Sequence, residues 1–234
     1  MAVGGAKICN TAIYAERRPT PRPIVLTRLR LRLKRFDVIV RSFRPVRLRY
    51  PAFGDLDALC AEYVAGRAGR GPTTTLDLGC GPAPRNPFGA ATVCGIDIRE
   101  HPERNVRTAD LAVEQIPHAD ASFDYVTAYD FIEHVPRVLY APARRFPFVE
   151  LMNEIYRVLK PDGAFLSFTP AYPFATAFQD PTHVNVITED TFPLYFDAIH
   201  AHARMYGFRG GFSIVRQGWQ KRHLVTLLAK ATPA

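Results

Sequence analysis

Two glycines and two aspartates fall at the ends of two neighbouring β-favouring runs. Gly79 and Gly81 follow the β-favouring run Thr73–Leu78, and without a Cβ they let the backbone turn tightly and approach a ligand. Asp97 comes 20 residues after Asp77, at the end of the next apolar run. A carboxylate at that place can accept both hydrogen bonds from a ribose diol. The spacing therefore predicts a nucleoside site at the carboxyl ends of two neighbouring strands.

The residues after this turn restrict the nucleoside. The dinucleotide fingerprint G-x-G-x-x-G needs a small sixth residue, and counting from Gly79 that residue is Pro84. Pro82 and Pro87 further shorten any helix whose N-terminus would hold a pyrophosphate. The sequence has neither a G-x-x-x-x-G-K-[ST] phosphate loop nor a G-x-S-x-G elbow. The pattern favours a nucleoside that carries no phosphate.

Short apolar runs alternate with helical patterns from about residue 55 onward, which is typical of a parallel sheet covered on both faces. We expect a helix over Asp55–Arg67. We expect strands at Thr73–Leu78, Ala91–Ile98, Asn105–Ala109, Phe123–Ala128 and Gly163–Thr169. The runs Phe212–Val215 and His223–Ala229, joined by a turn at Gln217-Gly218, predict an antiparallel hairpin at the sheet edge.

A strong helix pattern precedes the fifth strand. Pro147 suits a first turn, and Pro161-Asp162-Gly163 ends the pattern. One face of this helix would carry Val149, Met152, Ile155, Tyr156 and Leu159. That spacing predicts a helix packed on the sheet.

Composition excludes several classes of protein. The 234 residues are 47% apolar and 22% charged, which is the balance of a globular protein with one sizeable core. No run approaches the roughly 20 apolar residues of a membrane span, and no signal-peptide pattern is present. Four cysteines (Cys9, Cys60, Cys80 and Cys94) lack the spacing of a disulfide framework or a zinc site. We expect reduced thiols, a cytoplasmic location and no metal.

The positive charge is concentrated at the N-terminus. Residues 1–50 hold 13 basic residues against Glu16 and Asp37, whereas the rest carries 17 basic and 20 acidic residues. Leu29–Lys34 alternates Leu with Arg or Lys, as in a strand or an extended arm. We expect a basic extension over 1–50 and one domain over 51–234. The extension is a poorly ordered tail, an arm for an anionic partner such as RNA, a phospholipid surface or an acidic glycan, or an organelle transit peptide, whose Arg-rich and acid-poor composition it shares.

The motifs, taken in order, resemble those of class I S-adenosylmethionine-dependent methyltransferases over about residues 55–230. The matching pieces are Leu76-Asp77-Leu78-Gly79-Cys80-Gly81, Gly95-Ile96-Asp97-Ile98, Asp110-Leu111, Phe123-Asp124-Tyr125-Val126, Glu133-His134-Val135, and Glu154 through Gly163. The resemblance implies an α/β, Rossmann-like fold with a seven-stranded, mostly parallel sheet, an antiparallel last strand and helices on both faces. The chain departs from the family at Ala83, where a third glycine is usual, and its short Pro-rich loop predicts a first helix of a turn or two.

The resemblance also implies which residues bind the cofactor, S-adenosylmethionine. The backbone of Gly79, Cys80 and Gly81 would approach the methionine end, with Asp77 supporting the turn. Asp97 would take the ribose hydroxyls, and Ile98 would pack on the adenine. Asp110 would accept from the adenine amine, the Leu111 amide would reach a ring nitrogen, and Tyr129 would lie near the methionine end.

Methyl transfer mainly requires that the acceptor is aligned with the S–CH₃ bond and that water is excluded. A hydroxyl acceptor also needs a base. In this fold the segments after the fourth and fifth strands line the acceptor side. His183, with Asp180 three residues away to orient it, is the preferred base, and His134 is a second candidate. Alternatively, His183 only fixes its loop. A metal set of Asp180, His183 and Glu189 is conceivable, but no spacing favours it.

Three functions remain open on the sequence. The first is an enzyme that methylates oxygen or nitrogen of a small molecule or glycan. The second is an RNA methyltransferase that uses the basic arm, although the domain itself is slightly acidic and lacks an Asn/Asp-Pro-Pro-Tyr motif. The third is a catalytically silent protein that binds the cofactor. The acceptor and the oligomeric state do not follow from these patterns.

Overall fold

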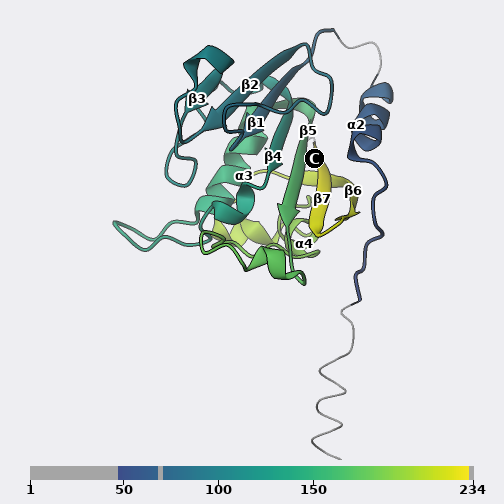
Figure 1. Cartoon of the computed structure of the whole chain (residues 1–234). Coiled ribbons are helices and arrows are strands. Elements are labelled where there is room, and N and C mark those ends of the chain that lie inside the picture. Colours follow the sequence, from purple (N-terminus) through teal and green to yellow (C-terminus); the bar gives the residue numbers. More distant parts are fainter. Residues whose placement is uncertain (1–46, 68–70, 232–234) are drawn as a thin grey trace, which may run out of the picture. The chain divides into compact units, whose positions relative to one another are not determined.

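Seven strands form one sheet in the order β3-β2-β1-β4-β5-β7-β6 (Figure 1). The computed structural model describes residues 47–67 and 71–231. Strands β1 to β5 pair in parallel, and β7 runs antiparallel to both β5 and β6. The bounds are β1 Thr74–Leu78, β2 Thr92–Asp97, β3 Val106–Thr108, β4 Phe123–Tyr129, β5 Leu159–Pro170, β6 Phe212–Gln220 and β7 His223–Lys230. The predicted α/β fold class is confirmed.

Three α-helices and four short 3-10 helices complete the described structure. They are α2 Leu56–Ala65, α3 Pro147–Val158, α4 Thr191–Tyr195, η1 Pro102–Arg104, η2 Ile132–His134, η3 Ala175–Ala177 and η4 His202–Tyr206. The expected helix over Asp55–Arg67 is present as α2. Its N-terminus is capped by the Asp55 carboxylate, which accepts from the amide of Asp57 at 2.9 Å.

Apolar clusters cover both faces of the sheet. The larger cluster packs α3 and α4 against one face, where Val126 of β4 and Phe165 of β5 are fully buried. The smaller cluster packs α2 against the other face, around Tyr125 of β4 and Leu166 of β5. Neighbouring residues of β4 and β5 therefore belong to opposite clusters, as a sheet buried on both faces requires.

Helix α3 begins and packs as predicted but ends earlier. Met152 and Ile155 are fully buried, whereas Val149 and Tyr156 are half-buried. The helix ends at Val158, so Leu159 is the first residue of β5. Pro161-Asp162-Gly163 forms an irregularity inside β5, where the pairing with β4 shifts. This irregularity replaces the predicted helix end.

The predicted hairpin turn at Gln217-Gly218 is wrong. Strand β6 continues through both residues to Gln220, and the turn follows at Lys221-Arg222. A Cβ on Gly218 would lie 2.7 Å from the carbonyl oxygen of Pro51, so the glycine permits close contact with another segment rather than a turn. Residues 51–53 pair with Trp219 through two backbone hydrogen bonds at that place. A long-range contact thus explains a residue that local patterns assign to a turn.

The N-terminal prediction can be compared with the structure only at its end. Residues 1–46, which include Leu29–Lys34, lie outside the described residues. The second compact unit spans Leu48–Ala234. No helix in the described ranges is long and apolar enough to cross a membrane.

Gly218→Ala tests the packing of residues 51–53 on β6. We expect the free energy of unfolding in urea to fall by about 1–3 kcal/mol, because the added methyl group overlaps the Pro51 carbonyl. Gly71→Ala is the matched control, since a Cβ there meets nothing within 4 Å. Equal stability of both variants would contradict the contact.

Candidate functional site

The turn after β1 bends back onto the end of β2. The amides of Gly79 and Cys80 both donate to the carbonyl of Ile96, at 2.8 and 3.2 Å. Gly79 and Gly81 have φ angles of +65° and +57°, which glycine adopts without strain. A Cβ on Gly79 would lie 2.3 Å from the Phe131 ring, whereas one on Gly81 would meet nothing within 4 Å. The turn therefore requires glycine at position 79 and leaves open space at position 81.

The Asp97 carboxylate faces this turn. One of its oxygens accepts from the amide of Gly81 at 2.8 Å, and the other accepts from the amide of Arg99 at 3.0 Å. Each oxygen keeps a second lone pair for a ligand hydroxyl. The next side chain, Ile98, is 64% exposed although it is apolar. A carboxylate beside an open glycine turn and an uncovered apolar side chain fits the ribose and the base of a nucleoside.

Asp110 lies next to Asp97, because the amide of Ala109 donates to the Asp97 carbonyl at 3.1 Å. The Asp110 carboxylate accepts from the amide of Ala112 at 3.0 Å, and the Leu111 side chain is buried in the core. The Cys80 thiol donates to the Gly81 carbonyl at 3.2 Å, and its Sγ lies 2.4 Å from where a Cβ on Gly95 would be. Asp97, Ile98, Asp110 and the turn are thus brought to one edge of the sheet.

Asp77 holds the Pro-rich loop rather than the glycine turn itself. It is fully buried and accepts from the Thr127 hydroxyl at 2.6 Å and from the Arg85 amide at 2.8 Å. Burial raises the pKa of this carboxyl to about 6, while the two hydrogen bonds act in the opposite direction. No helix forms between β1 and β2 in the described structure, so the predicted short helix is wrong, because its prolines and the Asp77 bonds hold this segment as a loop.

Tyr129 lies at the end of β4, on the face that α2 covers. Its ring packs on Phe168 with 5.5 Å between centroids, and the Arg85 guanidinium stands 4.5 Å above it. Burial raises the pKa of its phenol. Tyr129 is therefore linked to Asp77 through Arg85 rather than to Asp97 directly.

The acceptor-side candidates gather around Glu133. One ligand atom each from Glu133, His134 and His183 lies within 4.8 Å of the others, and the rings of the two histidines meet edge to face at 4.8 Å between centroids. Glu133 is 1% exposed, and burial raises the pKa of its carboxyl to about 7 despite a 2.7 Å hydrogen bond from the Thr169 hydroxyl. The sequence analysis used Glu133 only as part of a motif and assigned it no role. Its burial depends on contacts with β5 and the 183–185 segment, which no local pattern shows.

Asp180 orients a different histidine from the one expected. Its carboxylate accepts from the Thr182 hydroxyl at 2.6 Å, and the same hydroxyl lies 3.0 Å from Nδ1 of His134. The Thr182 hydroxyl has one proton and donates it in the hydrogen bond to Asp180. Its oxygen must therefore act as the acceptor toward His134, whose Nδ1 carries the hydrogen. Nε2 of a neutral His134 then carries the free lone pair. Among the described residues no side-chain hydrogen bond joins Asp180 to the His183 ring, so the predicted orientation of His183 by Asp180 is not seen.

Glu189 is excluded from any metal set with His183. Its carboxylate accepts from the amides of Arg49 and Tyr50 at 2.9 and 3.2 Å, and from Nε1 of Trp219 at 2.7 Å. These bonds hold the segment before α2 on the edge of β6. The set of Asp180, His183 and Glu189 that the sequence left conceivable is therefore wrong, because Glu189 serves this edge.

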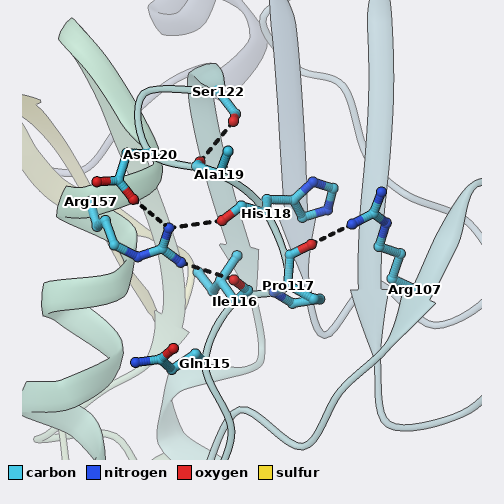
Figure 2. A pocket seen from close by; sticks show the side chains of 9 residues that line it. All are labelled: Arg107, Gln115, Ile116, Pro117, His118, Ala119, Asp120, Ser122 and Arg157. Carbon is cyan, nitrogen blue, oxygen red and sulfur yellow. Dashed lines mark hydrogen bonds and ion pairs between the residues drawn. The ribbon is translucent and has the colours of Figure 1, made fainter.

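A cavity of about 670 Å³ lies elsewhere, beside the segment that leads into β4 (Figure 2). Its guanidinium groups already have partners. Arg157 bonds to Asp120 and to the carbonyls of Ile116 and His118, and Arg107 bonds to the Pro117 carbonyl. None of the predicted site residues lines it, because it lies near the start of β4 and the site lies at the strand ends.

Residues 76–167 match the family described as a methyltransferase domain. Over that segment the chain is similar to class I S-adenosylmethionine-dependent methyltransferases. The ubiquinone biosynthesis O-methyltransferase of Pseudomonas paraeruginosa is 27% identical, over 62% of this chain and 66% of that protein. This chain therefore spans slightly less than two thirds of that relative's length.

Solved structures that resemble this methyltransferase are distant in sequence. A S-adenosylmethionine-dependent methyltransferase from Archaeoglobus fulgidus is 17% identical, with a TM-score of 0.48 over 75% of this chain and 93% of that one. The Burkholderia thailandensis 1,6-didemethyltoxoflavin-N1-methyltransferase, solved with its substrate and S-adenosylhomocysteine, is 17% identical, with a TM-score of 0.45 over 93% and 94%.

Asp97→Ala tests the ribose contact. We expect the affinity for S-adenosylmethionine, measured by calorimetry, to fall about 100-fold, because two hydrogen bonds to a charged group are lost. Asp197→Ala is the matched control: Asp197 also accepts from the amide two residues later, that of Ile199 at 2.9 Å, but lies far from the glycine turn in the sequence. Unchanged affinity in Asp97→Ala would defeat the assignment.

Asp77→Asn tests the buried carboxyl through pH. The folded pKa of about 6 exceeds the ordinary value of 3.8, so the folded state holds a proton that the unfolded state has released. The native protein should therefore lose stability relative to Asp77→Asn as pH rises from 4 to 7, by about 2 kcal/mol. Urea unfolding at several pH values measures this difference, and parallel curves would contradict it.

Proposed function

We propose that this methyltransferase transfers a methyl group to an oxygen or nitrogen of a small molecule or glycan, and that a hydroxyl is the acceptor group that its site favours. The observation that carries the proposal is the oriented imidazole of His134, beside His183 and the buried Glu133. An amine acceptor needs only to be held and aimed, whereas a hydroxyl needs a group that takes its proton. The site provides such a group.

The cofactor would be held by the turn and by the carboxylates at the ends of β2 and β3. The backbone of Gly79, Cys80 and Gly81 would face its methionine part, Asp97 its ribose, and Ile98, Asp110 and Leu111 its adenine. Asp77 and Tyr129 would not contact the cofactor directly. They would hold the Pro-rich loop after the glycine turn in place through their contacts with Arg85. When bound, S-adenosylmethionine supplies a methyl group activated by the positive charge on its sulfur.

Residues of the protein would then accept the proton that the acceptor hydroxyl loses. Nε2 of His134 is free to accept it, since Nδ1–H is directed to Thr182. Asp180 acts through Thr182 by fixing that tautomer. His183, which the sequence analysis preferred as the base, would contact the acceptor or share the proton. The Glu133 carboxyl would stabilise the imidazolium that forms.

The named relative supports an oxygen acceptor, since the Pseudomonas paraeruginosa protein is described as an O-methyltransferase. The test is incubation of the full chain with methyl-labelled S-adenosylmethionine and a fractionated cell extract, with and without RNase. We expect label in a small-molecule or glycan fraction that RNase leaves unchanged. Label in RNase-sensitive material, or cofactor binding with no labelled product, would contradict the proposal.

His134→Ala tests the base directly. We expect kcat toward the labelled acceptor to fall at least about 100-fold while the affinity for S-adenosylmethionine stays within about twofold. His183→Ala should also lose turnover, and Thr182→Val should lose about 10-fold because the tautomer is no longer fixed. His202→Ala, on η4, is the control. Full activity of His134→Ala would remove it as the base.

A further inference from the structure

We propose that Glu133, His134 and His183 bind a divalent transition-metal ion. The proposal rests on the function proposed above and deepens it, since the ion would lie where the acceptor hydroxyl loses its proton. Among the described residues these three form a group of histidine and carboxylate side chains whose ligand atoms lie within 4.8 Å of one another. What distinguishes the group is that two of its atoms, Oε1 of Glu133 and Nδ1 of His183, are buried without a hydrogen-bond partner in the described structure.

Three lone pairs are uncommitted. Oε1 of Glu133 and Nδ1 of His183 are both buried and have no hydrogen-bond partner in the described structure. Nε2 of His134 is unprotonated by the argument from Thr182. A buried polar atom without a partner costs about 1–3 kcal/mol, so two in one cluster indicate a missing ligand. A carboxylate oxygen and two imidazole nitrogens are a common metal donor set.

The surrounding backbone holds the two segments together. The carbonyl of Glu133 accepts from the amides of Val184 and Asn185, at 3.0 and 2.9 Å. The side-chain amide of Asn185 donates to the carbonyl of Ile132 at 2.9 Å. His183 is therefore fixed next to η2 by its neighbours, while its own ring nitrogen remains free. Around a tetrahedral ion with bonds of about 2.1 Å, the ligand atoms lie roughly 3.4 Å apart. The three ligand atoms are within 4.8 Å of one another, so side-chain rotations that move them by about 1 Å would bring them to an ion.

The outer contacts are those that metal ligands need. A metal-binding histidine usually donates its second N–H to an oxygen, and Nδ1 of His134 does so to Thr182, which is held by Asp180. The other oxygen of Glu133 accepts from Thr169 at 2.7 Å, which leaves Oε1 to turn inward. These partners orient two of the three ligands before any ion binds.

The charges nearby favour a cation, and the donors select its type. Burial chiefly, and the Asp130 charge in addition, raise the pKa of Glu133, and the Asp180 carboxylate accepts from the Thr182 hydroxyl that contacts His134. Nε2 of His223 lies 2.9 Å from Oδ1 of Asp130, and the Arg137 guanidinium is bound to Asn185 and to the Val186 carbonyl, so both side chains already have partners. Imidazole suits Zn²⁺, Fe²⁺ and Ni²⁺, whereas Mg²⁺ prefers oxygen ligands. We expect Zn²⁺ to bind and Mg²⁺ to bind far more weakly.

The ion would take over the task of the free His134 imidazole. An acceptor hydroxyl bound at an open coordination position forms a metal–oxygen bond, its O–H bond breaks, and the proton leaves to water. The histidines then serve as ligands rather than as bases. The methyl group still comes from the cofactor, and no oxidant or reductant takes part.

The binding experiment uses the full chain after treatment with EDTA. Calorimetry with Zn²⁺, and the visible spectrum after Co²⁺ addition, should show one ion per chain and a tetrahedral band. Glu133→Gln and His183→Ala should each weaken this binding at least about 10-fold, and Thr182→Val should weaken it about 10-fold through the outer contact. The double variant His200→Ala/His202→Ala, two histidines outside the cluster, should bind as the native chain does.

Circular dichroism and S-adenosylmethionine binding show whether each variant folds. Glu133→Asp keeps a carboxylate and should retain part of the affinity for Zn²⁺. Binding of Zn²⁺ that is unchanged in Glu133→Gln and His183→Ala, or no binding below millimolar Zn²⁺, would overturn the site. If the EDTA-treated chain binds no ion yet methylates the labelled acceptor, the metal proposal fails and the proposed function stands. If the ion binds at these residues but no acceptor is labelled, the site stands and the proposed function fails.

Discussion

The parallel pairing of β1 with β2 determines where this protein can do chemistry. It brings the Ile96 carbonyl within reach of the amides of Gly79 and Cys80, and it places the Asp97 carboxylate 2.8 Å from the Gly81 amide. The glycine turn can form only because positions 79 and 81 tolerate positive φ. The expected cofactor contacts depend on this contact between the glycine turn and the Asp97 carboxylate. The other strands lie on both sides of β1 and β2 in the same sheet.

The acceptor side is formed by a contact between two segments that are distant in the sequence, η2 and residues 183–185. η2 follows β4, and residues 183–185 follow β5, yet the Glu133 carbonyl accepts two amides from the later segment. That arrangement buries Glu133 and brings both histidines to it. Burying a carboxyl beside imidazoles without satisfying all its lone pairs costs stability. Residues that retain such a cost are frequent at functional sites.

Much of this fold can be predicted from the sequence, because buried parallel strands are continuous apolar runs and the glycine turn has a local signature. The strands β1 to β5, α2 and the start of α3 follow from such patterns. The errors come from contacts between distant residues. The turn predicted at Gln217-Gly218 is wrong because the contact of Gly218 with Pro51 has no local signature, and the bonds of Glu189 to Arg49 and Trp219, which separate it from the conceivable metal set, have none either. The orientation of His134 through Thr182 and Asp180 likewise depends on a contact between residues 48 positions apart in the sequence.

The most direct test of the account is to locate the cofactor on the protein. Amide NMR spectra of the labelled chain, recorded during titration with S-adenosylhomocysteine, report which backbone groups respond. The account predicts the largest shifts at the glycine turn, at Asp97 and Ile98, and at Asp110 and Leu111. Shifts concentrated instead around Arg107 and Arg157, with the glycine turn unmoved, would contradict it.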